Sequence, residues 1–494
     1  MLDNSAFCWP EGGESDSVRR MSKIFRAWKI DDPMLLPVSV QEFVDEKHLA
    51  SFVLGVVRDE LDLAKILSCY SSEKGQPPFH PVMMTALLLY AYCCGIYASR
   101  RIAKACRERV DFMSIVALDA PDFRTISDFR KRHLKELQEL FAQVLKLCDK
   151  AGLVKLGHVA VDGSKIKANA SKHKAMSYGR MEARAKELED EVKQWFAAAE
   201  ATDAEEDELY GHDKQGDELP DWVANKQKRA ERIRAAKAEL EAEAKAAAEE
   251  KIKAQAEENK KEKQRKKALP SPEPDPKAQK NFTDPESRIM KGKDGFVQAY
   301  NGQITVDAQA QIIVAQHVTQ CAADSPQLIP MVDAVEANLG RKPEQVSADC
   351  GYCSEANLEA MEKREIDAYV ATGRAKHATA EQAEAATRAL TTIAVRPPSS
   401  TQEAEPPTRV EAMREKIKAG GYASPYRLRK QLPEPVFGQI KQARGFRQFL
   451  MRGVEKVRAE WALVCTAHNL LKLAQGRSLS RARKVTQKGA LALA

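Results

Sequence analysis

The sequence predicts an α/β protein in which a helical N-terminal region precedes a mixed β-sheet, with a charged helical hairpin inserted into the sheet region. Three observations lead to this prediction. From about residue 36 to 155, apolar residues recur at three- and four-residue spacing, as in amphipathic helices. From residue 158 onward, short apolar runs bounded by glycine or polar turns alternate with helical patterns. A long segment rich in Ala, Glu, Lys and Arg interrupts this alternation.

The bulk composition is that of a soluble intracellular protein. The 494 residues suffice for two or three domains, and 43% hydrophobic residues suffice for a substantial core. No run of 18 or more apolar residues occurs, and the N-terminus lacks a basic region followed by an apolar one, so we expect a cytoplasmic location and no membrane partner. The ten cysteines show no regular framework, which indicates reduced thiols.

Residues 1–155 form the predicted helical N-terminal domain, which we expect to bind DNA. Its clearest helical runs are residues 52–57, 82–97, 102–116 and 126–147. A basic helix with Arg100 and Arg101, a turn at 119–122 and a helix from Thr125 have the order of a helix-turn-helix DNA reader. An ordinary helical bundle with basic faces explains the same pattern equally well, and both interpretations stay open.

Five strands are predicted for the sheet domain, which we assign to residues 156–176 and 281–475. The strands are residues 158–163, 297–306, 312–319, 346–349 and 366–371. One helix begins at Ser325-Pro326, with Ser325 as its N-cap, and another begins after Ser354. This order of elements suits a mixed sheet in which the first and fourth strands are neighbours. Ligands of open α/β sheets gather at such strand ends.

Three acidic residues lie where that sheet would bring them together. Asp162 and Asp349 end or interrupt the first and fourth strands, and Glu434 opens a helix. Carboxylate oxygens suit Mg²⁺ or Mn²⁺, and two such ions roughly 4 Å apart can serve the attacking and leaving oxygens of phosphoryl transfer. Each acid taken singly is weak evidence, because the chain has 71 Asp and Glu residues. The strand order favours one shared metal site.

Two inserted segments and a basic tail complete the predicted organisation. Residues 177–280 carry apolar side chains on one helical face in each half, with a break near 210–220, which indicates two antiparallel helices. We interpret this hairpin as a solvated arm, with a dimerisation element as the alternative. Residues 375–423 contain two Pro-Pro pairs and are predicted to be a flexible insert. Residues 476–494 form the basic tail.

Four motifs follow one another along most of the chain. They are Gly75-Gln-Pro-Pro-Phe-His-Pro81, Val161-Asp162-Gly163-Ser164-Lys165, Ala348-Asp349-Cys350-Gly351-Tyr352 and Glu434-Pro-Val-Phe-Gly-Gln-Ile-Lys441. Together they resemble the DDE transposases of bacterial insertion sequences, in the group whose last acid lies in a Tyr, Arg, Glu, Lys signature. A charged helical insertion after the first Asp marks one subgroup of that family.

The resemblance implies a ribonuclease-H-like core and an enzyme that cleaves DNA and transfers the cut strand at the ends of an insertion sequence. Asp162, Asp349 and Glu434 would be its catalytic residues and the ligands of two Mg²⁺ or Mn²⁺ ions. The implied partners are double-stranded DNA, both as terminal inverted repeats and as target, and further copies of the chain in a homodimer or higher oligomer. We therefore expect the protein to be associated with the nucleoid.

The signature is irregular ahead of Glu434. In the family, Tyr precedes Arg by three positions and Arg precedes Glu by four. Tyr426 and Arg429 keep the first spacing, but Arg429 lies one residue too far from Glu434. Lys430 has the correct spacing to Glu434. Arg429 and Lys430 are therefore alternative candidates for the basic residue of the signature that contacts DNA.

Three further lysines are candidates for contact with DNA phosphates. Lys441 lies seven residues after Glu434, on the same helical face, and Gly438 between them would let a DNA backbone approach. Phe437 and Ile440 would face the core. Lys165 and Lys167 follow the first acid closely, but packing or solvation explains them equally well.

Two other functions remain as alternatives. The irregular spacing before Glu434 would fit a transposase-derived DNA-binding protein that no longer cleaves. Cys350 and Cys353 form a Cys-x-x-Cys pair, a remote indication of a thiol redox or zinc protein, which lacks a second pair nearby in the sequence.

Overall fold

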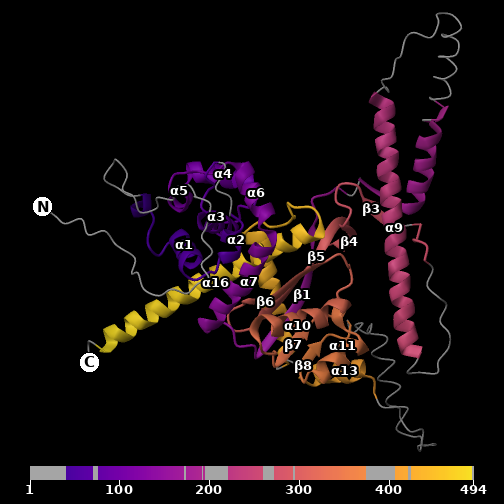
Figure 1. Cartoon of the computed structure of the whole chain (residues 1–494). Helices are drawn as coiled ribbons and strands as arrows, with labels where there is room; N and C mark the ends of the chain where they lie inside the picture. Colours follow the sequence, from indigo (N-terminus) through magenta and orange to yellow (C-terminus); the bar gives the residue numbers. More distant parts are fainter. Residues whose placement is uncertain are drawn as a thin grey trace, which may run out of the picture. The chain divides into compact units, whose positions relative to one another are not determined.

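The computed structural model describes residues 40–70, 76–171, 174–191, 193–194, 221–259, 272–276, 278–292, 295–373, 407–420 and 424–491 (Figure 1). The chain forms two compact units. The first comprises Met1–Ala91 and Ala98–Gln143, and the second comprises Tyr92–Tyr97 and Val144–Ala494. No helix among the described residues is long and apolar enough to cross a membrane.

The described part of the first unit is helical, as the apolar spacing predicts. Its elements are η1 (Val40–Phe43), α1 (Leu49–Asp59), α2 (Ala64–Ser68), α3 (Pro81–Cys93), α4 (Ser99–Glu108), α5 (Val110–Val116), α6 (Phe123–Arg132) and α7 (Leu134–Lys150). Helix α3 is the centre of the unit, because its almost continuously apolar sequence is buried on every side, as at Met83 and Leu87. Its last two residues belong to the second unit.

The basic segment that resembles a helix-turn-helix contains one helix more than expected. The predicted run 102–116 is divided between α4 and α5, because Arg109 has extended backbone angles (φ −120°, ψ 124°). Helix α6 begins at Phe123 and is capped by Asp122, whose carboxylate accepts a 2.7 Å hydrogen bond from the Thr125 amide. Helix α4 packs against both α5 and α6.

The border between the units falls inside α7, upstream of the boundary expected at residue 155. The end of this helix packs within the second unit. There the Cys148 thiol donates to the backbone carbonyl of Asn469 at 3.7 Å, and Asp149 forms an ion pair with Arg341.

A mixed six-stranded sheet forms the core of the second unit (Figure 1). Its strands are β1 (His158–Lys167), β4 (Arg288–Gly292), β5 (Gly295–Asp307), β6 (Ile313–Thr319), β7 (Gln345–Ala348) and β8 (Asp367–Val370). The central order is β5-β1-β7-β8, in which β1 is antiparallel to β5 and parallel to β7. Strands β4 and β6 pair with successive halves of the other edge of β5. The predicted adjacency of the first and fourth strands is therefore confirmed.

Among the helices that pack against this sheet or its edge strands are α10 (Leu328–Leu339), α11 (Glu355–Lys363) and α16 (Val454–Leu491). Helix α16 packs on β6, and the Asn469 side chain accepts from the Ile313 amide at 2.9 Å and donates to its carbonyl at 2.8 Å. Ser354 caps α11 as predicted. Ser325 does not cap α10, because a 3-10 turn, η3 (Ser325–Gln327), begins there after Asp324.

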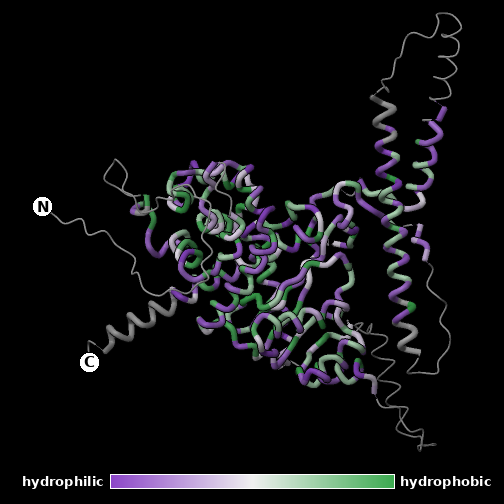
Figure 2. Tube along the Cα trace, viewed as in Figure 1, coloured by the Kyte–Doolittle hydropathy of each residue, from purple (hydrophilic) through white to green (hydrophobic). Residues whose placement is uncertain are grey.

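The described part of the first insertion has the two antiparallel helices that the sequence predicts. Helix α9 (Asp221–Asn259) lies beside the helical segment 178–194. The chain segments that lead into and out of this arm pair as the antiparallel strands β2 (Ala175–Ser177) and β3 (Gln279–Asn281). The apolar contact between the helices is made by Met181, Ala185, Leu188, Ala230, Ile233, Ala236 and Leu240. Figure 2 shows hydrophobic and hydrophilic positions alternating along both helices of this arm. The predicted break at 210–220 lies outside the described residues.

The second insertion, residues 375–423, is not a flexible linker throughout. Its part 409–420 forms helix α13 (Arg409–Gly420), with Met413 buried. Lys416 forms an ion pair with Asp367 at 2.5 Å, and Arg409 pairs with Glu362 at 2.9 Å. Residues 374–406 and 421–423 lie outside the described part. Helix α16 runs through residue 476, the expected start of the basic tail, to Leu491.

Candidate functional site

Two of the three predicted acids leave adjacent parallel strands at the same level. Strand β1 pairs with β7 up to Val161 opposite Ala348, so Asp162 and Asp349 are the next residue on each strand. Asp162 stays paired with Ile304 of β5 on its other side. In both acids the Oδ1 atom accepts a hydrogen bond from the following backbone amide, at 2.8 Å for Asp162 and 2.6 Å for Asp349. These bonds fix both carboxylates.

The third acid comes from a broken helical segment. After η6 (Pro425–Arg427), helix α14 (Leu428–Gln431) ends at Leu432, and α15 (Pro433–Gly438) begins with Glu434 in its first turn. Leu432 has φ −104° and ψ −71° and is buried, which turns the chain between the two helices. Helices α14 and α15 both contact β1, and α14 also contacts β7.

Arg429 brings the three acids together. Its guanidinium lies 2.9 Å from Asp349 Oδ2, 3.5 Å from Asp162 Oδ2 and 3.7 Å from Glu434 Oε1. The Arg429 side chain is only 11% exposed, whereas that of Glu434 is 53% exposed. Acids from β1, from the residue after β7 and from α15 thus share one cation, which α14 supplies. The structure brings Asp162, Asp349 and Glu434 together through this common contact.

The site concentrates negative charge, and Asp162 is the least exposed of its three acids. Burial raises the pKa of Asp162 to about 6, with Asp349 and Asp324 adding to the effect and Arg429 and the Gly163 amide opposing it. Burial also lowers the pKa of Arg429, but the neighbouring carboxylates, Asp162 first, outweigh it and raise the pKa overall. A cation is therefore strongly favoured between these acids.

A fourth acid, Asp324, supports the site and was not identified from the sequence. Its Oδ1 atom accepts hydrogen bonds from Lys165 Nζ at 2.9 Å, Asn301 Nδ2 at 2.7 Å and Gln303 Nε2 at 2.9 Å. The Tyr352 hydroxyl donates to the other end of the Gln303 amide. The only sequence signal was the position of Asp324 before Ser-Pro, which indicates a helix start and no role at the site.

Gly163 makes room for this hydrogen-bonded layer. A Cβ atom at Gly163 would lie 2.1 Å from Gln303 Nε2 and 2.9 Å from Asp324 Oδ1. The glycine after the first acid is therefore required because the Gln303 amide packs directly against the backbone of β1.

Lys441 approaches β1 just beyond the first acid. Its ammonium group donates to Ser164 Oγ and lies 3.4 Å from the carbonyl oxygen of Lys165. The helix does not continue as two regular α turns, because residues Gln439–Ala443 form a π-helix, η7. Phe437 and Ile440 are buried, as predicted. A Cβ at Gly438 would have no atom within 4 Å, so this surface is open.

The other side chains near the site that are predicted to contact DNA have different surroundings. Tyr426 is half-buried beside Arg429 and Asp349, and its pKa is raised chiefly by burial. Lys430 is exposed and is not the base that contacts the acids. Lys165 is paired with Asp324 at 2.9 Å.

Lys167, Arg100 and Arg101 make no contact with the acidic cluster. The Lys167 side chain is exposed, and its carbonyl accepts from the Phe449 amide at 2.9 Å. Arg100 and Arg101 lie on α4 of the first unit, where the Arg100 guanidinium stands 5.1 Å from the centre of the Phe123 ring. A role of these three residues in DNA binding stays a prediction.

The donor set of the acidic cluster fits a hard divalent cation. Asp162, Asp349 and Glu434 supply only carboxylate oxygens, and all three already contact one positive group. In the described part of the chain, no three His, Cys, Asp or Glu side chains are arranged as a ready-made ion site. The guanidinium of Arg429 instead lies among the three carboxylates.

Cys350 and Cys353 lack the properties of a reactive thiol pair. Both are free, and burial raises the pKa of each thiol, with Asp349 adding to the effect at Cys350 and Glu355 at Cys353. Redox-active thiols instead have a lowered pKa. The redox interpretation is not favoured.

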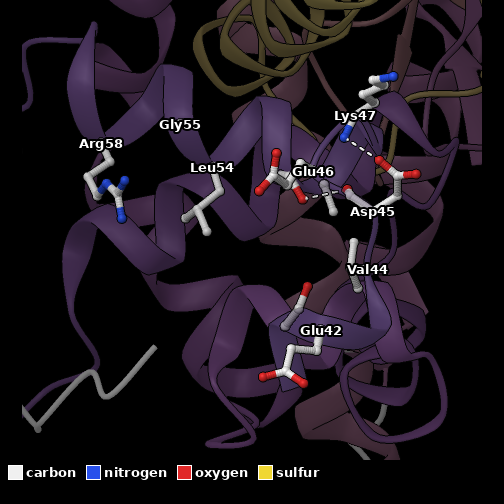
Figure 3. A pocket seen from close by; sticks show the side chains of 11 residues that line it. Glu42, Val44, Asp45, Glu46, Lys47, Leu54, Gly55 and Arg58 are labelled. Atoms are coloured by element: carbon white, nitrogen blue, oxygen red, sulfur yellow. Dashed lines mark hydrogen bonds between the residues drawn. The ribbon is translucent and has the colours of Figure 1, made fainter. Parts of the chain in front are cut away.

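A separate hollow of about 750 Å³ lies in the first unit, and none of the predicted site residues lines it (Figure 3). Charges of both signs surround it, among them Glu42, Glu46 and Arg58. The Asp45 carboxylate accepts from the Lys47 amide at 2.7 Å, so this acid stabilises the local turn. The lining suggests no chemistry.

Comparison with known proteins identifies the family. Residues 38–132 match the model described as Transposase domain (DUF772), and residues 232–470 match the model described as Transposase DDE domain. Asp349 and Glu434 lie within the second match, and Asp162 precedes it. No curated protein and no solved structure matches the chain. The two family matches follow each other along the sequence, and the chain belongs to the DDE transposases of insertion sequences.

Proposed function

We propose that this transposase cleaves DNA and transfers the cut strand at the ends of an insertion sequence, with two Mg²⁺ or Mn²⁺ ions held by Asp162, Asp349 and Glu434. The contact of all three carboxylates with the single guanidinium of Arg429 supports this proposal. We also propose that the sheet is a ribonuclease-H-like core. The order β6-β5-β1-β7-β8, with β5 antiparallel to both of its neighbours in this series, supports that assignment.

The chain's own residues hold and orient the reactants. The Oδ1 atoms of Asp162 and Asp349 are occupied by backbone amides, so the Oδ2 atoms are directed to the shared cation. When bound, the divalent ions supply an activated oxygen nucleophile and stabilise the leaving oxygen. Lys441 provides a positive charge beside Ser164, where it can contact a DNA phosphate. Arg429 would provide a second positive charge if Asp162, Asp349 and Glu434 held an ion in its place.

The proposed partners are the terminal inverted repeats of the element and its target DNA. Further copies of the chain would assemble on the DNA as a homodimer or higher oligomer, at the nucleoid in the cytoplasm. These proposals rest on the family and on the basic side chains near the acids.

The test is Mg²⁺-dependent cleavage of DNA that carries the inverted ends flanking the gene. Asp162→Asn, Asp349→Asn and Glu434→Gln should each slow cleavage at least about a hundredfold, since each removes charge that holds the ions, and such losses amount to several kcal/mol. Asp333→Asn is the matched control, because Asp333 is a half-exposed acid paired with Arg364 away from the cluster. Full cleavage by the three site variants would contradict the assignment. DNA binding without cleavage by the unaltered chain would favour an inactive, transposase-derived DNA-binding protein.

A further inference from the structure

Six cations in the first half of helix α9 fall into two groups with different partners. On the side that faces the helical segment 178–194, each has an acidic partner: Lys226 lies 2.6 Å from Glu191, Arg234 lies 2.7 Å from Glu189, and Lys237 lies 3.1 Å from Glu182. The charge of these three cations is therefore compensated within the arm.

The second group surrounds a cavity of about 490 Å³ at the base of the arm. The charged residues that line the cavity are Lys228, Arg229 and Arg232 of α9 and Lys174, which directly precedes β2. All four side chains are exposed. Within the described ranges, no carboxylate forms an ion pair with any of them. Among the residues that the structure describes, the positive charge that lines the cavity is therefore uncompensated.

Helix geometry makes this arrangement unfavourable without a ligand. Arg229 and Arg232 are three residues apart and Lys228 and Arg232 are four apart, so these like charges are neighbours on one face and repel one another. A polyanion would relieve the repulsion. Duplex DNA carries a negative charge about every 1.7 Å along its axis, which suits several closely spaced cations.

The cavity also has an apolar surface. Met176 and Ile233 line it together with Phe282, whose ring is 37% exposed although it is large and hydrophobic. An exposed aromatic ring among basic side chains is typical of nucleic-acid-binding surfaces, where it packs against sugars or bases.

We propose that this cavity binds the phosphodiester backbone of DNA, so that the arm is a DNA-holding surface in addition to the acidic site. The proposal rests on the proposed function, which makes DNA the substrate. It goes beyond that function in assigning the insertion a direct contact with DNA through Lys174, Lys228, Arg229 and Arg232.

Salt-dependent DNA binding tests the proposal. The full-length chain with Lys228→Ala, Arg229→Ala and Arg232→Ala is titrated against a fluorescent duplex carrying the inverted ends, without divalent ions, at several salt concentrations. Each phosphate contact contributes about 0.9 to the slope of log K against log salt, so the slope should become shallower by roughly 2 to 3. Circular dichroism checks that the helix content is unchanged.

The matched control is Lys226→Ala, Arg234→Ala and Lys237→Ala, which removes the same charge from the same helix. These cations have acidic partners, so the salt slope should stay that of the unaltered protein. An equal change of slope in both triple variants, or no change in either, would overturn the proposal. If the variant with Lys228, Arg229 and Arg232 replaced loses helix content, Lys174→Ala is the variant that tests the proposal. Lys174 lies outside α9, and its replacement should make the salt slope shallower by about 1.

Binding without metal separates this proposal from the proposed function. If the unaltered chain does not cleave but the slope changes as expected, the catalytic assignment fails and the arm contact stands. If it cleaves and the slope is unchanged in the Lys228, Arg229 and Arg232 variant, the arm contact fails alone.

Discussion

The Nη2 atom of Arg429 lies 2.9 Å from Oδ2 of Asp349, which joins a cation on a short helix to an acid at the end of a strand. The same guanidinium reaches Glu434 although one residue more than the family spacing separates them. The chain turns at Leu432, between α14 and α15, before it reaches Glu434. Arg429 and not Lys430 is therefore the base that contacts the acids.

Replacing Arg429 with alanine should destabilise the metal-free protein. The acids would lose their common partner, and the contact with Asp349 is a hydrogen bond between charged groups, a type that contributes about 1.5–3 kcal/mol. Adding Mg²⁺ or Mn²⁺ should then raise the melting temperature more in the variant than in the unaltered chain, because the ion no longer displaces a guanidinium and binds more tightly. Thermal unfolding with and without the ions measures both effects.

Lys430→Ala serves as the control for that experiment. It removes the same charge one residue further along the same helix, from an exposed side chain that does not contact the acids. Its melting temperature and its response to the ions should match those of the unaltered chain. Equal effects of both substitutions would contradict the role of Arg429 as the shared partner.

A methyl group at Gly163 should disrupt the layer behind the first acid. In Gly163→Ala the new Cβ would lie 2.1 Å from Gln303 Nε2, which forces the amide away from Asp324 and Tyr352. We expect a loss of about 1–3 kcal/mol in the free energy of unfolding, because buried polar groups lose their partners. Urea unfolding measures the loss.

The glycine at position 438 provides the comparison. It has helical backbone angles, φ −59° and ψ −47°, and a Cβ there would have no atom within 4 Å. Gly438→Ala should leave the stability unchanged or raise it by up to about 1 kcal/mol, as for glycine in a helix. A similar loss in both variants would argue against the clash at Gly163.

Strands with a regular apolar pattern were predictable from the sequence, whereas elements that depend on tertiary partners were not. The five predicted strands are present because their alternation and turns are local properties. Strand β4 is short and partly charged, and it exists because the long strand β5 offers an edge. Helix α13 was missed because its ion pairs, such as Lys416 with Asp367, join residues far apart in the sequence.

The same distinction applies to the site. The proximity of Asp162 and Asp349 was predictable, because they follow neighbouring strands whose parallel pairing ends one residue before each acid. The choice between Arg429 and Lys430 depends on the backbone turn at Leu432, which spacing alone does not reveal. The role of Asp324 was not predictable from the sequence, because it depends on hydrogen-bond partners on strands β1 and β5.

Removing the Asp324 carboxylate should weaken the fold around the site. Asn301 and Gln303 are fully buried, and Asp324→Ala leaves a donor of each without its acceptor. We expect a loss of about 1–3 kcal/mol for each unpaired group, measured by urea unfolding. Asp333→Ala, at a half-exposed acid of α10, should cost less than 1 kcal/mol, as is typical of surface ion pairs at roughly 0–1 kcal/mol. Equal costs for both would contradict the supporting role of Asp324.

A buried histidine should make the stability of the second unit depend on pH. His468 is buried, its Nε2 lies 2.9 Å from the Gln311 carbonyl, and its Nδ1 lies 3.3 Å from Arg444. Burial lowers the pKa of His468 from 6.5 to about 3, and the charge of Arg444 adds to this shift. The folded protein therefore keeps the ring neutral at pH values where the unfolded chain protonates it.

The sign of the effect follows from proton uptake. Between pH 6.5 and about 3, the unfolded state binds a proton at His468 that the folded state does not, so acid destabilises the fold over this range. The loss approaches about 1.4 kcal/mol per pH unit. His468→Gln removes the titrating group, so between pH 6 and pH 4 the unaltered chain should lose roughly 2–3 kcal/mol more than the variant. Urea unfolding, followed by tryptophan fluorescence at several pH values, measures the difference in unfolding free energy between the two proteins. The other titrating groups are the same in both proteins, so their contributions cancel. Parallel pH curves for the two proteins would show that His468 is already protonated in the fold, with Arg444 turned away from it.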